Sequence, residues 1–175
     1  MRLRLACVIL GLTLRSAGAR ADEQAHPLFL GLGLGAGAAS VQPHDAAGLE
    51  RRAVMCLMHV GYQLSPAWRA GLDVHGGTFA VENDWVSVNH ISIGTVTFFP
   101  DAPGGLYLKA GLGVGYLNTT YLRSHSGLDV LAATGWEHHL GEQWAVGVEA
   151  WYALTRLSDG TLADASLAAL LAYRL

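Results

Sequence analysis

Alternation of apolar residues with small or polar residues organises the chain, and it is clearest from Leu106 to Tyr116. One set of alternate positions is apolar throughout: Leu106, Leu108, Ala110, Leu112, Val114 and Tyr116. The other set is polar or has almost no side chain: Tyr107, Lys109, Gly111, Gly113 and Gly115. A period of two is typical of a β-strand whose two faces meet different surroundings. The glycine-rich face predicts a cramped interior. The continuous apolar face must then point outward, which lipid tolerates and water does not.

Similar alternation recurs along the rest of the chain, between segments rich in turn residues. The predicted strands are 28–38, 53–64, 68–76, 85–99, 106–116, 128–140, 144–155 and 162–175. Within 85–99 the apolar positions change parity between Val88 and Ile91, which predicts a β-bulge near Asn89 and His90. Strands of this number and length are typical of an all-β fold, an eight-stranded antiparallel up-and-down transmembrane β-barrel.

The predicted connections alternate in length. The segments 65–67, 100–105 and 141–143 are short, whereas 40–52, 77–84, 118–127 and 156–160 are mostly longer. Barrels of the outer membrane have short periplasmic turns and longer external loops. The pattern therefore places both termini on the periplasmic side.

Composition agrees with a barrel. The chain is 51% hydrophobic and 14% charged, against about 25% charged in an average soluble domain. No apolar run approaches the roughly 18 residues that a transmembrane helix needs. The 22 glycines leave room inside a small barrel. A formal net charge of −3 gives no reason to expect a nucleic-acid partner.

The first residues predict export. Arg2 and Arg4 precede an apolar segment, 5–14, and Ala19-Arg20-Ala21 forms a small-x-small cleavage site. We therefore expect a signal peptide over 1–21 and a barrel domain over 22–175. Its removal leaves Cys56 as the single cysteine, so no disulfide within the chain is expected.

Charged residues on the predicted strands fall on the inward face. Those expected to form an ion-pair network in the lumen are Arg69, Asp73, Lys109, Glu137, Glu149 and Arg174. Asp129, His59, His75 and His139 are also expected to point inward. An eight-stranded barrel is filled by its own side chains, and an unpaired buried charge costs several kcal/mol. The network is therefore expected to plug the barrel, with Glu137 as the nearest partner of Lys109. The alternative is a gated proton or ion path.

Aromatic residues gather near the short turns and the C-terminus. Those predicted to form an aromatic girdle are Tyr62, Trp68, Tyr107, Trp136, Trp144 and Tyr173. Aromatic rings with a polar edge concentrate at membrane interfaces, whereas a soluble barrel has no reason to collect them at one end.

Two hairpins, GYQLSPAWRAGL (61–72) and HLGEQWAVGVE (139–149), carry a resemblance to a known family. The chain resembles the small eight-stranded outer-membrane barrels of the OmpA-like and OmpX-like group, over nearly all of 22–175. The resemblance implies a porin-like fold, an outer-membrane location in a Gram-negative bacterium and insertion by the barrel assembly machinery. Such barrels usually end in Phe or Trp, whereas this chain ends in Leu175, with Tyr173 two residues earlier. We expect this departure to affect assembly more than fold.

No catalytic, cofactor-binding or metal site is predicted. A lipid A deacylase of this architecture would need a His-x-Ser pair on the penultimate strand, and 151–155 has neither residue. Ser124-His125-Ser126 offers a serine beside a histidine, but in a predicted loop without an evident acid. His138 and His139 are adjacent on a strand and point apart, which disfavours a shared metal. The glycines of 31–37 alternate as strand residues, so they do not form a dinucleotide-binding motif.

The main hypothesis is a non-enzymatic integral outer-membrane protein with a structural or surface-interaction role. Its expected partners are outer-membrane lipid, lipopolysaccharide, the assembly machinery and a surface ligand that the sequence does not identify. One alternative is a lipid A-modifying enzyme that uses His125 and a neighbouring serine. The other is a soluble lipocalin-like carrier, which would place its apolar residues inside.

Overall fold

The computed structural model describes residues 28–44, 48–81, 84–101, 105–119 and 125–175. Its strands are β1 (Leu28–Pro43), β2 (Leu49–Ser65), β3 (Trp68–Val81), β4 (Asp84–Phe98), β5 (Gly105–Thr119), β6 (His125–His139), β7 (Trp144–Arg156) and β8 (Gly160–Arg174). Within these residues no helix is long and apolar enough to cross a membrane. The predicted signal peptide, 1–21, lies outside the described residues.

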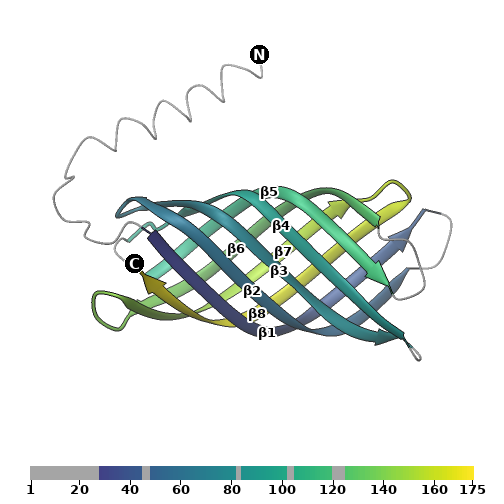
Figure 1. Cartoon of the computed structure of the whole chain (residues 1–175), viewed down its shortest axis with the longest axis horizontal. Helices are drawn as coiled ribbons and strands as arrows, with labels where there is room; N and C mark the ends of the chain where they lie inside the picture. Colours follow the sequence, from purple (N-terminus) through teal and green to yellow (C-terminus); the bar gives the residue numbers. More distant parts are fainter. Residues whose placement is uncertain (1–27, 45–47, 82–83, 102–104, 120–124) are drawn as a thin grey trace, which may run out of the picture.

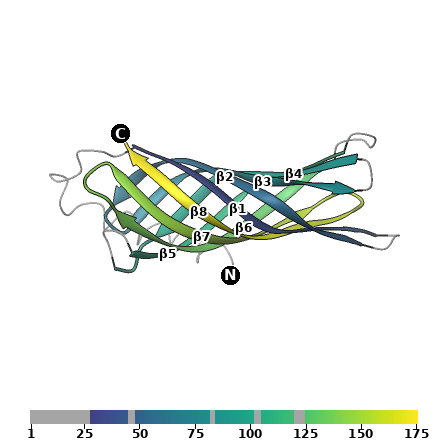
Figure 2. The same cartoon turned by 90° about the horizontal axis from the view of Figure 1, so that it is seen from below.

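Each strand pairs antiparallel with its neighbours in sequence, and β1 pairs with β8 to close the barrel. Figure 1 and Figure 2 show the strands running obliquely around one elongated barrel. This is the predicted eight-stranded antiparallel up-and-down barrel. β1 begins and β8 ends at the same end of the barrel, which we call the terminal end (Figure 1). The opposite end is called the far end.

The predicted facing of the strands is confirmed. In β1, Leu32 and Leu34 are 55% and 63% exposed, while Phe29 between the outer leucines is buried. In β5, Leu106 and Leu112 are exposed, and Lys109 is buried in the lumen. Apolar side chains therefore cover the outside of the barrel, and the buried charges lie inside it. A lipocalin-like carrier would have the reverse arrangement.

Several strands extend well beyond their predicted ends at the far end. β1 and β2 continue pairing to Val41 opposite Leu49, through residues expected to form a loop. The connections at the far end are consequently 44–48, 82–83, 120–124 and 157–159, and those at the terminal end are 66–67, 99–104 and 140–143. The predicted contrast between long and short connections is wrong. An apolar alternation ends where the outer face becomes polar, whereas backbone pairing continues past that point.

The bulge in β4 lies further along the strand than predicted. Register shifts occur between Gly71 and Asp73 of β3 and between Ser92 and Gly94 of β4. In β4 the inward-facing residues have even numbers up to Ser92 and odd numbers from Thr95 onward. The change of parity therefore falls at residues 93–94, and not at Asn89 and His90.

The far end of the lumen is apolar, which the sequence pattern did not indicate. Buried apolar side chains there form a group that we call the apolar layer: Phe79, Val86, Val88, Leu117, Leu157 and Leu162. The outer face beside this layer carries polar side chains: Gln42, Glu50, Arg52, Thr78, Asn118 and Arg156. At the far end the barrel therefore has the arrangement of a water-exposed barrel, apolar inside and polar outside.

Glycines allow close approach of the strands, and Gly113 of β5 provides a test. A Cβ atom at Gly113 would collide with the carbonyl oxygen of Ile91, whereas a Cβ at Gly94 meets nothing within 4 Å. Gly113→Ala should lower the free energy of unfolding by about 1 to 3 kcal/mol, the usual cost of overpacking. Urea unfolding in detergent, followed by tryptophan fluorescence, measures this loss. Gly94→Ala is the matched control, and equal stability of the two variants would contradict the close approach.

Candidate functional site

The buried charges of the lumen form three successive clusters. Arg69, Asp73 and His75 follow one another along β3, away from the terminal end, and each belongs to a different cluster. We name these the terminal cluster, around Arg69; the central cluster, around Lys109 and Asp73; and the histidine cluster, around His75 and His90. The apolar layer lies beyond the third cluster.

A bidentate ion pair forms the terminal cluster. The two terminal nitrogens of Arg69 donate to the two carboxylate oxygens of Glu137, each at 2.7 Å. Bidentate arginine–carboxylate pairs are among the strongest charged hydrogen bonds, and they fix orientation. The guanidinium also lies 4.4 Å from the ring centre of Phe99. His139 and Arg174 lie 3.0 and 3.7 Å from the same carboxylate. Glu137 is therefore shared among three basic groups.

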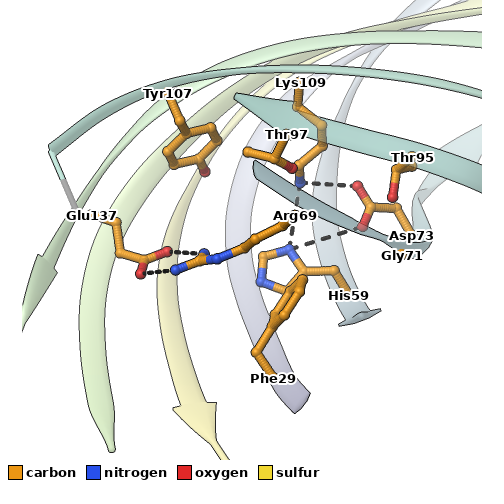
Figure 3. A pocket seen from close by; sticks show the side chains of 10 residues that line it. All are labelled: Phe29, His59, Arg69, Gly71, Asp73, Thr95, Thr97, Tyr107, Lys109 and Glu137. Carbon is orange, nitrogen blue, oxygen red and sulfur yellow. Dashed lines mark hydrogen bonds and ion pairs between the residues drawn. The ribbon is translucent and has the colours of Figure 1, made fainter. Parts of the chain in front are cut away.

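Lys109 is the centre of the second cluster. Its Nζ lies 2.7 Å from Glu149 Oε2 and 2.9 Å from Asp73 Oδ2 (Figure 3 shows the Asp73 contact). The hydroxyl of Tyr107 donates to Glu149 at 2.5 Å, and His59 Nδ1 lies 3.4 Å from the Lys109 amine. Every polar group around the amine is buried. Lys109 is thus held between two carboxylates rather than one.

All six residues of the predicted network therefore lie on the lumenal side, but in two separate groups. The expected pairing of Lys109 with Glu137 is wrong, because Glu137 binds Arg69. Glu137 lies opposite Gly105 in the β5–β6 ladder, four positions from the level of Lys109. Distance across the lumen, which sequence order does not reveal, decides which charges meet.

A small cavity separates the terminal and central clusters. It is lined by residues of both clusters together with Phe29, Thr95 and Thr97 (Figure 3). The space open to the centre of a water molecule is about 10 Å³, which is room for about one water.

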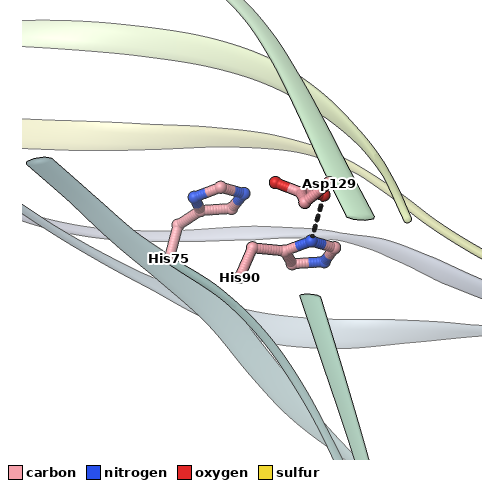
Figure 4. Close-up of side chains that lie close together, drawn as sticks. All are labelled: His75, His90 and Asp129. Atoms are coloured by element: carbon pink, nitrogen blue, oxygen red, sulfur yellow. Dashed lines mark hydrogen bonds and ion pairs between the residues drawn. The ribbon is translucent and has the colours of Figure 1, made fainter. Parts of the chain in front are cut away.

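The histidine cluster contains no lysine or arginine among the described residues. His90 lies between two aspartates, with Nδ1 2.8 Å from Asp129 and Nε2 2.6 Å from Asp164 (Figure 4 shows the first contact). The ring of His75 stacks on that of His90, with centroids 4.8 Å apart and planes 2° from parallel. Thr155 donates to Asp129 at 2.9 Å. All of these side chains are buried.

Two members of this cluster were not indicated by the sequence pattern. His90 was not assigned to a face, because the bulge in β4 obscured the parity of that strand. Asp164 lies near the start of β8, while the alternation in β8 was evident from Ala169 onward. Extending that parity backward places Leu162, Asp164 and Ser166 inward, as the structure does.

The predicted aromatic girdle has a different composition in the structure. Outward and exposed are Tyr62, Trp136 and Trp144. Trp68 and Tyr173 are half-buried, the latter against Trp144 with ring centres 4.7 Å apart. Tyr107 is not part of a girdle, because it shares the parity of Lys109 and is 2% exposed inside the barrel.

His125 has an acidic partner that the sequence did not reveal. Its Nδ1 lies 3.3 Å from Asp159 at the far end, where both side chains are partly exposed. Ser126 is exposed, and Ser124 lies outside the described residues. No serine that the structure describes is hydrogen-bonded to His125. An activated serine needs that bond to its base, so His125 and the described serines do not form a nucleophile–base pair.

Comparisons with known proteins give a fold but no sequence family. No family model matches the chain, and no curated protein is similar to it in sequence. Neisserial surface protein A has a similar structure, with a TM-score of 0.64, 9% identity and coverage of 85% of this chain and 97% of that chain.

Two further solved structures are similar. The attachment invasion locus protein Ail of Yersinia pestis, in complex with the heparin analogue sucrose octasulfate, has a TM-score of 0.55 and 16% identity, covering 85% of this chain and 99% of that chain. OprG of Pseudomonas aeruginosa has a TM-score of 0.50 and 12% identity, covering 88% and 99%. This chain therefore has the fold of the small eight-stranded outer-membrane β-barrels.

Proposed function

We propose that the protein is an integral outer-membrane β-barrel with a structural or surface-interaction role. The outward apolar surface carries this proposal. Large apolar side chains are exposed on every strand except β3, among them Leu34, Val54, Val60, Leu112, Leu154 and Leu171. On β3 the outward side chains of Leu72 and Val74 are half-buried. An apolar surface that surrounds a whole barrel is far larger than the patches that soluble monomers expose. Lipid is the partner that such a surface fits.

The ends of the barrel support an orientation. The strands have 13 to 17 residues, more than the 9 to 11 or so that cross a bilayer. The polar outer face lies at the far end, so that end extends beyond the lipid. In this orientation the terminal end is periplasmic, and the far end is the surface that meets external ligands or lipopolysaccharide. Export through a signal peptide over 1–21 and insertion by the assembly machinery belong to the same proposal.

The lumen supports a plugged barrel rather than an open pore. Two ion-pair clusters with a cavity the size of about one water between them, then the histidine cluster and the apolar layer, follow one another along the axis. Charged groups held by several partners do not leave their positions readily, because a stranded charge in the interior is costly. We therefore assign the charged residues a structural role, and place interaction with partners at the far end.

Membrane location is tested by fractionation together with electrophoretic mobility. The protein should sediment with the outer membrane, and in detergent it should migrate differently before and after heating. A soluble periplasmic protein serves as the control for fractionation. Recovery in the periplasmic fraction, with the same mobility before and after heating, would refute the proposal.

The plug is tested by conductance. The purified protein in planar lipid bilayers should give no steady ion current, because side chains fill the lumen. A porin reconstituted in parallel verifies that the bilayer detects open channels. A reproducible current from this protein would favour the gated ion path instead.

The pairing of Lys109 is tested by a double-mutant cycle. Lys109→Met should lower the free energy of unfolding by about 3 to 5 kcal/mol, because it leaves two carboxylates without their cation. Combining it with Glu149→Gln should recover part of that loss, giving an interaction energy of about 0.5 to 3 kcal/mol. Urea unfolding in detergent measures each variant. The control cycle combines Lys109→Met with Glu137→Gln, whose effects should add; stronger coupling there than with Glu149 would contradict the observed pairs.

A further inference from the structure

The histidine cluster differs chemically from the two ion-pair clusters. We propose that His75, His90 and Asp129 form a binding site for one divalent transition-metal ion, of the class of Zn²⁺ or Cu²⁺, inside the barrel, with Asp164 holding the other ring nitrogen of His90. The proposal goes beyond the structural role assigned above, and it depends on the fold of the lumen rather than on any external partner.

The donor atoms already lie close together. One ligand atom each from His75, His90 and Asp129 can be chosen so that all three lie within 4.8 Å of one another. The second aspartate, Asp164, contacts the other ring nitrogen of His90 at 2.6 Å. Ligands of a tetrahedral site with bonds of about 2.0 to 2.2 Å lie roughly 3.3 to 3.6 Å apart. Small side-chain rotations, without a change of strand register, would therefore bring three of these groups around a metal.

His75 supplies an independent indication of a missing ligand. The residue is 2% exposed, and neither ring nitrogen has a hydrogen-bond partner among the described residues. Buried polar groups almost always have a partner, and leaving one without is unfavourable. Figure 4 shows its ring stacked on His90 beside Asp129. A metal bond would satisfy a ring nitrogen that no described protein group reaches.

The charges of the lumen also favour a cation at this position. Arg69 and Lys109 are engaged by Glu137, Glu149 and Asp73 in the other clusters. Asp129 and Asp164 have no arginine or lysine as an ion-pair partner within the described chain, and His90 can neutralise only one of them. Two buried carboxylates beside two imidazoles therefore lack positive charge, and a divalent ion provides it.

Further contacts orient these ligands. The Trp151 indole nitrogen donates to Asp164 Oδ1 at 2.7 Å, and the Thr155 hydroxyl donates to Asp129 Oδ1 at 2.9 Å. Hydrogen bonds of this kind hold metal-binding carboxylates in position. Imidazole with carboxylate suits Zn²⁺, Cu²⁺ or Ni²⁺, whereas Mg²⁺ and Ca²⁺ prefer oxygen ligands alone.

Access determines how the site must be tested. The apolar layer closes the lumen on the far-end side, and the two ion-pair clusters fill it on the other. A metal ion is therefore expected to enter while the barrel folds and to leave slowly afterwards. The full protein should be folded in detergent with Zn²⁺ and dialysed against metal-free buffer before the bound zinc is measured.

The comparison uses two histidine variants. Wild type should retain about one zinc per chain, and His75→Phe, which keeps a stacking ring, should retain none. His138→Ala removes an exposed histidine on the outer face and should retain zinc like wild type. Heat-dependent mobility verifies folding of each variant, and Asp129→Asn replaces His75→Phe if the latter does not fold. Zinc that is absent from folded wild type, or retained equally by His75→Phe, would overturn the proposal.

Spectroscopy of the wild-type protein gives a second readout. With Cu²⁺ in place of zinc, electron paramagnetic resonance of wild type should show nitrogen coupling from two imidazoles, and His75→Phe should give no such signal. A signal lost in His138→Ala but kept in His75→Phe would mean a surface site, and would also overturn the proposal.

Discussion

The narrow lumen of an eight-stranded barrel is the constraint on which the rest of this structure depends. Strand number and stagger fix its width, so large inward side chains must share a small cross-section. Glycine on a neighbouring strand makes this possible. A Cβ at Gly31 would collide with the ring of His59, and one at Gly135 would collide with Tyr107. Glycines such as Gly31 of β1 and Gly135 of β6 thus leave the space into which large polar side chains of the neighbouring strands fit.

The same constraint explains the pairing of the charges. On the proposed location in the membrane, the outer face lies in lipid, so the interior is the one place where a strand can carry Lys109 or Glu149. In that interior a lone charge is strongly unfavourable, while a satisfied pair contributes little net stability. The main effect of these buried ion pairs is to fix the register of the strands. A slip of one residue would turn Lys109 onto the apolar outer face and an apolar neighbour into the lumen. Charge pairing across the barrel therefore favours one strand register. Alternating glycine and leucine residues alone would define that register less strictly.

Much of the fold was predictable from the sequence because the alternation of apolar and small residues directly reflects two environments. Facing in β5, the number of strands and the order of pairing all follow from it. The partners of Lys109 did not follow, since they depend on which side chains meet across the lumen. The inward position of His90 was missed because a bulge at 93–94 interrupts the alternation in β4. Tyr107 was assigned to the girdle because it is aromatic, although its position in the alternation places it inside the barrel. The apolar layer was missed because the pattern inverts at the far end, where the outer face becomes polar and the lumen apolar.

The three clusters of the lumen differ in how their carboxylates are neutralised, so filling space does not explain all of them equally. The apolar layer at the far end shows that this chain fills space with Phe79, Leu117 and Leu162 where nothing else is required. Replacing buried charged groups by apolar ones is often neutral or stabilising, so packing alone does not explain Asp129, Asp164 and two histidines. The terminal and central clusters balance their carboxylates with Arg69 and Lys109, and they fix register. The histidine cluster has neither arginine nor lysine among its described members, and it leaves His75 without a hydrogen-bond partner. A group of side chains retained at that cost, on four different strands and with supporting hydrogen bonds from a fifth, is better explained by an ion that it binds than by the space that it fills.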